Sequence, residues 1–215
     1  MAATHASGLL RADLLDGVGV ALAHAGSGSA ADAGGAIAQA VQAGCGALGA
    51  RVLDLPLSGG DGALLGEDAI DAAVEGLLGE GASVEMLVVD GAGLYAAGAG
   101  RAALVESMQA CWSVTRAVVN RAFMAETSSP PPRRIVFVAP APGAGEHAEA
   151  ARAGLENLAR TLSIEWSRHG ITPVAIVPGD DTAADEVAAL VAYLASPAGA
   201  YFSGCLLDLR GPTYS

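Results

Sequence analysis

The sequence contains no lysine, and its eleven cationic side chains are all arginines. Against them stand 23 Asp and Glu residues, which give the chain a formal net charge of −12 at pH 7. Nucleic acids and anionic membranes need a cationic protein face, so neither is predicted as a partner. The absence of lysine also excludes chemistry that depends on a lysine ammonium group. Arginine does not replace it, because a guanidinium is effectively never deprotonated.

Cysteine and histidine are also scarce, with three cysteines and four histidines in the chain. The cysteines are odd in number and widely spaced, at Cys45, Cys111 and Cys205. This spacing fits neither a disulfide framework nor a metal cluster, and the histidines show no ligand spacing. We therefore expect reduced thiols, no metal and a cytoplasmic location.

Near the N-terminus an unbroken apolar run is missing. The charged side chains of Arg11, Asp13 and Asp16 interrupt the apolar residues there. A signal peptide and a membrane-spanning helix both need a continuous apolar segment, so neither is predicted.

What the sequence has in abundance is apolar side chains, which make up 52% of its 215 residues. That is ample for one domain with a sizeable core. Short apolar runs typical of buried strands occupy residues 17–24, 50–55, 84–90, 135–140, 172–178 and 204–209. Helical periodicity occupies residues 30–43, 67–78, 101–124, 146–168 and 185–195. The alternation predicts one Rossmann-like three-layer α/β/α domain over residues 1–215, with a mainly parallel sheet of about six strands.

Four segments follow the pattern of one enzyme family. Residues 154–179 (GLENLARTLSIEWSRHGITPVAIVPG) have the form of a long helix, a strand and a Pro-Gly turn, and residues 185–211 that of a closing helix and last strand. Residues 84–93 have the form of a strand ending in a glycine turn, and residues 113–124 that of the following helix. Together they resemble the short-chain dehydrogenase/reductase family. The resemblance is good from residue 84 onward, holds only in outline before it, and implies the same fold.

In that family a tyrosine passes a proton to or from the substrate, while a lysine four residues later lowers its pKa and holds the nicotinamide ribose. Counting from the matched segments places Ala148 at the tyrosine and Arg152 at the lysine. The family's serine falls at Ala139 or Pro140, and its helix asparagine near Ser107. None of these side chains replaces the expected group. The resemblance therefore implies a degenerate member without the family's hydride transfer.

Cofactor binding in the family depends on a glycine-rich first loop, whose backbone N–H groups meet the pyrophosphate. Gly26, Ser27 and Gly28 stand where that pattern begins, but the third glycine comes late and Asp32 brings a carboxylate toward the phosphate. The main expectation is that no cofactor binds, and binding of NAD or NADP is the alternative.

The resemblance implies further vestigial cofactor contacts. They are Asp54 for a ribose hydroxyl, Gly91 in the turn at residues 90–93, and the Pro178-Gly179 turn with Thr182. Asp54 also suits a simple turn or cap residue, and Thr182 an N-terminal helix cap.

Relative to the family the chain is short in two places. Between the first loop and residue 84 only one strand and one further helix fit, so part of the adenosine-binding edge is expected to be missing. Only residues 180–184 separate the Pro-Gly turn from the closing helix. That is too little chain for the family's substrate lid, which would exclude water.

The two long helices resemble those with which family subunits build a four-helix bundle. Candidate interface residues on them are Trp112, Val119, Leu158, Leu162 and Trp166. Tryptophan is enriched at interface centres, although packing against the sheet would explain both tryptophans as well. Our hypothesis is a catalytically inactive subunit that assembles with an active dehydrogenase or reductase of the family, or with itself.

Two alternatives remain open. One is a divergent NAD(P)-dependent oxidoreductase acting on a ketone, hydroxyl or acyl thioester, with Glu146 or His147 donating a proton and Arg152 orienting an anionic substrate. The other is a dinucleotide-binding sensor without catalysis.

Overall fold

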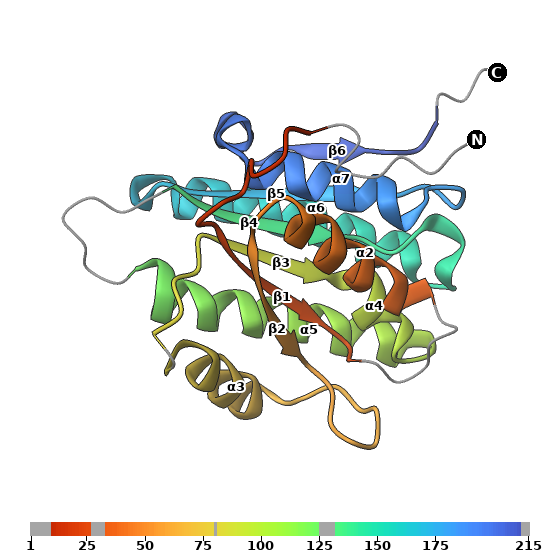
Figure 1. Ribbon diagram of the computed structural model, residues 1–215. Coiled ribbons are helices and arrows are strands. Elements are labelled where there is room, and N and C mark those ends of the chain that lie inside the picture. The colour runs from red at the N-terminus through yellow and green to blue at the C-terminus, as the bar shows by residue number, and fades with distance from the viewer. Residues whose placement is uncertain (1–9, 27–32, 80, 125–131, 212–215) are drawn as a thin grey trace.

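A six-stranded sheet forms the centre of the computed structural model, which describes residues 10–26, 33–79, 81–124 and 132–211. All neighbouring strands are parallel, in the order β2-β1-β3-β4-β5-β6 (Figure 1). The strands are β1 (Gly19–His24), β2 (Arg51–Pro56), β3 (Met86–Asp90), β4 (Arg133–Val138), β5 (Ile171–Val177) and β6 (Leu206–Asp208). The predicted Rossmann-like α/β fold is confirmed.

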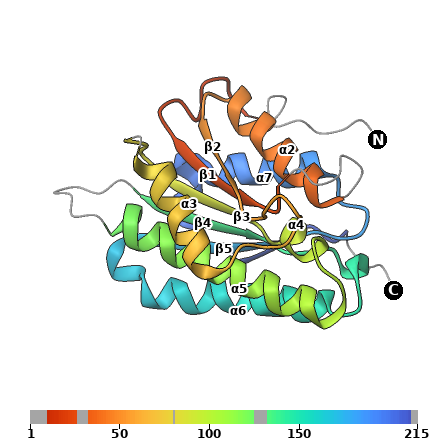
Figure 2. The same ribbon diagram turned by 90° about the horizontal axis from the view of Figure 1, so that it is seen from below.

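Helices cover both faces of the sheet, because each parallel strand pair needs a crossover that lays a helix on it. One face carries α2 (Ala33–Ala47) and α7 (Ala184–Ala195). The other carries α3 (Glu67–Gly79), α5 (Gly100–Val118) and α6 (Ala148–Glu165). Figure 2 shows the resulting three layers, with α5 and α6 side by side.

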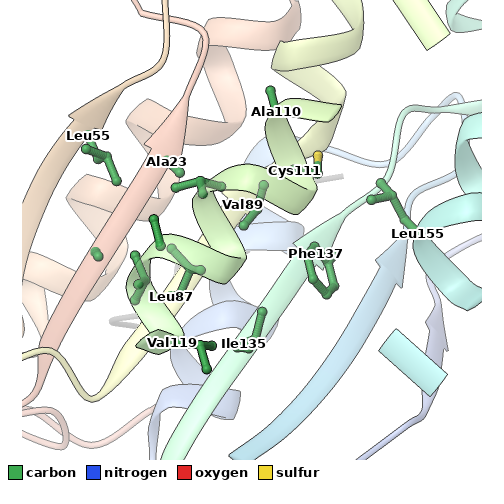
Figure 3. Close-up of a cluster of buried hydrophobic side chains, with 14 of the residues drawn as sticks. Ala23, Leu55, Leu87, Val89, Ala110, Cys111, Val119, Ile135, Phe137 and Leu155 are labelled. Atoms are coloured by element: carbon green, nitrogen blue, oxygen red, sulfur yellow. The ribbon is translucent and has the colours of Figure 1, made fainter. Parts of the chain in front are cut away.

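The central strands β1, β3, β4 and β5 are mostly apolar because both of their faces are buried, whereas the edge strands β2 and β6 are partly exposed. In β3, Leu87 and Val89 belong to the core under α3, α5 and α6, while Met86 and Val88 belong to the core under α2 and α7. Figure 3 shows the first of these cores, where Phe137 of β4 lies near Leu155 of α6.

Helix ends depart from the expected boundaries. The helix predicted over residues 101–124 is α5 followed by one π-helical turn, Val119–Phe123. The helix predicted over residues 146–168 is α6 followed by a 3₁₀ turn, Ser167–His169. Among the described residues no helix combines the length and apolar character needed to cross a membrane.

A short helix that the sequence analysis did not predict, α4 (Gly91–Ala96), follows β3 directly. Its two glycines lower helix propensity, so residues 90–93 favour a turn when taken alone. Asp90 caps the helix by accepting a hydrogen bond from the Gly93 N–H.

The chain leaves β1 for β2 on one side and crosses to β3 on the other. Ligands of open α/β sheets bind outside the carboxyl ends of the strands at such a reversal of strand order. β2 forms an edge, and the described residues place no strand outside it. The shortening of that edge relative to the family stays a prediction.

Candidate functional site

The first loop is tied to β2 through His24 at the end of β1. Its Nδ1 accepts a hydrogen bond from the Gly26 N–H at 3.0 Å, so Nε2 carries the proton and donates to Asp54 Oδ1 at 2.7 Å. Gly26 has a φ of +82°, and a Cβ there would lie 2.8 Å from Ser58 Oγ. Local packing therefore requires this glycine.

Two of the candidate phosphate-loop residues, Ser27 and Gly28, lie outside the described part of the chain, as does Asp32. Asp54 is described, and its carboxylate is engaged by His24. That contact uses one of the two carboxylate oxygens, Oδ1. Contact of the loop and of Asp54 with a cofactor stays a prediction.

Asp90 places a carboxyl group inside the core at the end of β3. The residue is fully buried; its Oδ1 accepts from the Gly93 N–H at 2.9 Å, and its Oδ2 is buried without a hydrogen-bond partner. Burial raises the pKa of this carboxyl to about 7, although the backbone N–H groups of Gly93 and Ala92 oppose the shift. An acid that follows the apolar run MLVV signals such burial in the sequence, but the protonation state does not follow from the pattern.

Gly91 follows Asp90 in the chain, and Cys111 of α5 lies close to Gly91. A Cβ at Gly91 would lie 2.8 Å from both the Val138 carbonyl oxygen and Leu155 Cδ1, so the predicted cofactor glycine has a packing role. Burial, helped by the Asp90 charge, raises the pKa of the Cys111 thiol to about 12. Such a thiol is not a nucleophile at neutral pH.

Arg152, at the predicted lysine position, joins the ends of two strands. Its buried Nη1 donates to the carbonyl oxygens of Pro140 at 2.6 Å and Pro178 at 2.8 Å. Burial lowers the pKa of the guanidinium, and Glu149, 3.6 Å from Nε, partly offsets this. Nη1 thus binds the protein's own backbone.

Ala148, at the predicted tyrosine position, is fully buried beside a tyrosine from another element. Tyr95 of α4 packs against Ala148, and its Oη accepts from the His147 N–H at 3.2 Å. Glu146 is exposed and His147 half-buried. The sequence analysis missed Tyr95, because nothing local to α4 indicates that its ring reaches α6.

The Pro-Gly turn after β5 is held by Thr182. Its Oγ1 accepts from the Gly179 N–H at 2.8 Å and donates to the Leu209 carbonyl at 3.3 Å. The Glu186 side chain, rather than Thr182, accepts from the Ala183 N–H at the start of α7. The hydroxyl therefore links the turn to the chain after β6, and its role toward a nicotinamide stays a prediction.

Ala139 and Ser107 complete the positions carried over from the family. Ala139 is fully buried, and the Ser107 hydroxyl donates to the Leu104 carbonyl in its own helix at 3.2 Å. The described residues include no group of three or more His, Cys, Asp or Glu side chains that could hold a metal ion.

The predicted interface residues divide into two groups. Val119 and Leu162 are buried in the chain's own core, so a partner cannot reach them in this conformation. Leu158 and Trp166 pack partly against that core, and Trp112 is exposed. Val119 is the first residue of the π-helical turn, and an interface role for the five residues stays a prediction.

Comparison with solved structures identifies the fold as that of the short-chain dehydrogenases/reductases. A citronellol catabolism dehydrogenase of Pseudomonas aeruginosa matches with a TM-score of 0.68 at 23% identity, covering 94% of this chain and 96% of that one. A Serratia marcescens short-chain dehydrogenase/reductase mutant gives 0.67 at 18% identity, with 91% and 96% covered. The 3-alpha-hydroxysteroid dehydrogenase of a Pseudomonas species, solved with NADH, gives 0.63 at 17%, with 89% and 94% covered.

These identities establish the fold and carry no activity over to this chain. No protein-family model matches the sequence, and no curated protein is significantly similar to it. The function has to be argued from the chain's own surfaces and site.

Proposed function

We propose that this chain is a non-catalytic subunit with a short-chain dehydrogenase/reductase fold. It assembles with an active dehydrogenase or reductase of the same fold, or with a second copy of itself, through the outer faces of α5 and α6. The observation that carries the proposal is the exposed apolar surface on these two helices. A reducing, cytoplasmic setting belongs to the same proposal, since Cys45, Cys111 and Cys205 are all free thiols.

Three of the four large apolar side chains that are exposed among the described residues lie on α5 and α6. Val105 and Trp112 are two helical turns apart on α5, so they share a face, with 56% and 37% of their surfaces exposed. Ile164, near the end of α6, is 75% exposed. The sequence analysis named only Trp112 of these three.

One stripe of α6 that leads to Ile164 carries no charged side chain, although the exposed Arg160 and Arg168 lie four positions to either side of Ile164. Exposed uncharged residues lead along α6 to Ile164 at intervals of three or four positions: Ala150, Ala153, Asn157 and Thr161. At Gly154 a Cβ would lie 3.0 Å from Met108 Cε, so the glycine leaves room for the α5 side chain between the helices. Depletion of charge around aromatic and aliphatic anchors is typical of interface cores.

The described residues at the carboxyl ends of the strands fit a nicotinamide cofactor poorly. Ala148 has no proton to donate, and Arg152 Nη1 already donates to two backbone carbonyls. These two contacts hold Arg152 Nη1 on the backbone rather than free for a ligand. We therefore assign no catalytic step to this site.

Size-exclusion chromatography with light scattering tests the interface. The wild-type chain is expected to have a dimer's mass alone, or a heteromer's mass when produced with an active relative from the same organism. Trp112→Arg and Ile164→Arg should reduce that mass to a monomer's, because each buries a charge without a partner. Tyr201→Arg is the matched control, because Tyr201 is exposed but lies outside both helices. A monomeric wild type in both settings, or variants of unchanged mass, would contradict the proposal.

The likeness to solved dehydrogenases favours one second candidate, a divergent NAD(P)-dependent oxidoreductase. Calorimetric titration with NADH and NADPH to about a millimolar detects binding as weak as about −4 kcal/mol. Absence of heat would leave the subunit proposal standing. Saturable binding would support an enzyme or a dinucleotide sensor, and turnover of ketones or acyl thioesters would then distinguish these two.

A further inference from the structure

Tyr95 lies in a socket of small residues, which we call the Tyr95 socket and define as Ala103, Gly145, Ala148 and Ala151. Only 4% of the tyrosine is exposed, and the three alanines form one buried cluster with its ring. Gly145 closes the socket near the hydroxyl, since a Cβ there would lie 2.9 Å from Oη and 3.4 Å from Cε1. These four small residues leave room for the ring, and the larger Leu104 packs against the same cluster.

The Tyr95 hydroxyl also satisfies a helix donor. It accepts the N–H of His147, the residue that precedes α6, at 3.2 Å. The first N–H groups of a helix have no partner within the helix, and leaving one buried and unpaired is costly. The ring and the hydroxyl thus have separate partners. Phenylalanine at position 95 would keep the ring contacts and lose the hydrogen bond.

The socket includes position 148, where the family resemblance expects a tyrosine. Ala148 is fully buried under Tyr95, so tyrosines at 95 and at 148 would compete for the same space. One helical turn further on, Arg152 binds the carbonyls after β4 and β5. Tyr95 and Arg152 therefore occupy the region around the start of α6, at the carboxyl ends of the strands.

We propose that Tyr95 is a built-in occupant of this site. Its phenol group fills the space beside residue 148 from within the chain, and it fastens α4 and α5 to α6. Removing the ring opens a site for a free phenol. This inference goes beyond the subunit proposal, because it concerns the isolated chain and needs no association.

The first test opens the socket and refills it with a small molecule. Tyr95→Ala should lower the melting temperature by roughly 6–15 °C, from the loss of a buried aromatic ring. Millimolar p-cresol should restore about 3 °C or more of that loss, since a ligand that binds only the folded state stabilises it. Toluene should restore less, because it lacks the oxygen that accepts the His147 N–H. Wild type and the exposed control Tyr201→Ala should respond to neither compound.

Equal rescue by toluene and p-cresol, or no rescue by either, would overturn the proposal. If Tyr95→Ala does not fold, Tyr95→Phe keeps the ring and still tests the hydroxyl. It should melt roughly 2–6 °C below wild type, because a partly buried N–H loses its acceptor. An unchanged melting temperature for Tyr95→Phe would count equally against it.

The second test moves the tyrosine. Ala148→Tyr in the wild-type background should lower the melting temperature, since two rings cannot share the socket. In the Tyr95→Ala background the same change should raise the melting temperature, because the new ring takes the vacated space. Such a reversal of sign is the coupling that a double-mutant cycle detects. Additive effects of the two changes on the melting temperature would contradict the inference that both rings need the same space. A failure of the subunit proposal would instead appear in the molecular mass of the assembly.

Discussion

Asp90 shows how one buried side chain makes stability depend on pH. In the unfolded chain its carboxyl has an ordinary pKa of 3.8, and burial raises the folded pKa to about 7. Below pH 3.8 both states bind the proton, and ionisation of the group does not affect stability. Between 3.8 and 7 only the unfolded state releases the proton, so the folded state loses stability as the pH rises. Above 7 the penalty is constant.

Asp90→Asn should remove this pH dependence. The asparagine oxygen can still accept from the Gly93 N–H, while no proton is bound or released. We expect the stability of wild type relative to the variant to fall by about 2–3 kcal/mol between pH 5 and pH 8, measured by urea unfolding. Asp181→Asn, at an exposed position, is the control and should keep the wild-type pH profile. Parallel profiles for wild type and Asp90→Asn would show that Asp90 is ionised throughout this range.

The three thiols should differ in reactivity. Burial raises the pKa values of Cys45 and Cys111 to about 12, whereas Cys205 is half-buried beside β6. The thiolate is the reactive form, so a disulfide reagent at pH 8 should modify Cys205 alone in the folded chain. All three should react in denaturant. Mass spectrometry of the labelled chain locates the modified residue, and early labelling of Cys111 would mean that the core opens readily.

At the scale of elements, glycine has opposite roles in two helices. Gly91 begins α4, where a Cβ would meet the Val138 carbonyl and Leu155. Gly76 is exposed in the interior of α3, with nothing within 4 Å of an added Cβ. Gly91→Ala should therefore lower the free energy of unfolding by about 1–3 kcal/mol. Gly76→Ala should raise it by about 0.5–1 kcal/mol, because alanine loses less backbone entropy. Equal effects in urea unfolding would contradict the packing at Gly91.

The long elements could be predicted from the sequence because their pattern is local. The four central strands are mostly apolar, and a strand buried on both faces needs only such a run, whereas the edge strands β2 and β6 are partly exposed. The short helix α4 could not be predicted, because its glycines favour a turn and its stability comes from the Asp90 cap and from contacts with α5 and α2. The π-helical turn was missed for a similar reason, since periodicity alone does not reveal one extra residue per turn.

The candidate site could be predicted only in part, because its contacts join distant positions. The family resemblance pointed to Arg152 and Gly91, but the partners of Arg152 are carbonyls at Pro140 and Pro178. Tyr95 reaches the start of α6 from an element that was not expected. The solvent exposure of Val105 and Ile164 could not be predicted from the sequence either. Both resemble ordinary core positions in a helical pattern, and only the packed structure places them on the surface.

For the whole molecule, the charge balance makes a prediction about assembly. Two copies that meet through α5 and α6 each carry a net charge of −12, so long-range repulsion opposes their association. Salt shortens the Debye length from about 10 Å at 0.1 M to about 3 Å at 1 M, which weakens that repulsion. The apolar contacts of Trp112 and Ile164 do not weaken in salt. Raising sodium chloride from about 0.05 to 0.5 M should therefore strengthen self-association by up to about tenfold, measured by sedimentation equilibrium. Ile164→Arg should show no such gain, and weaker association of wild type at high salt would indicate an interface held together by opposite charges.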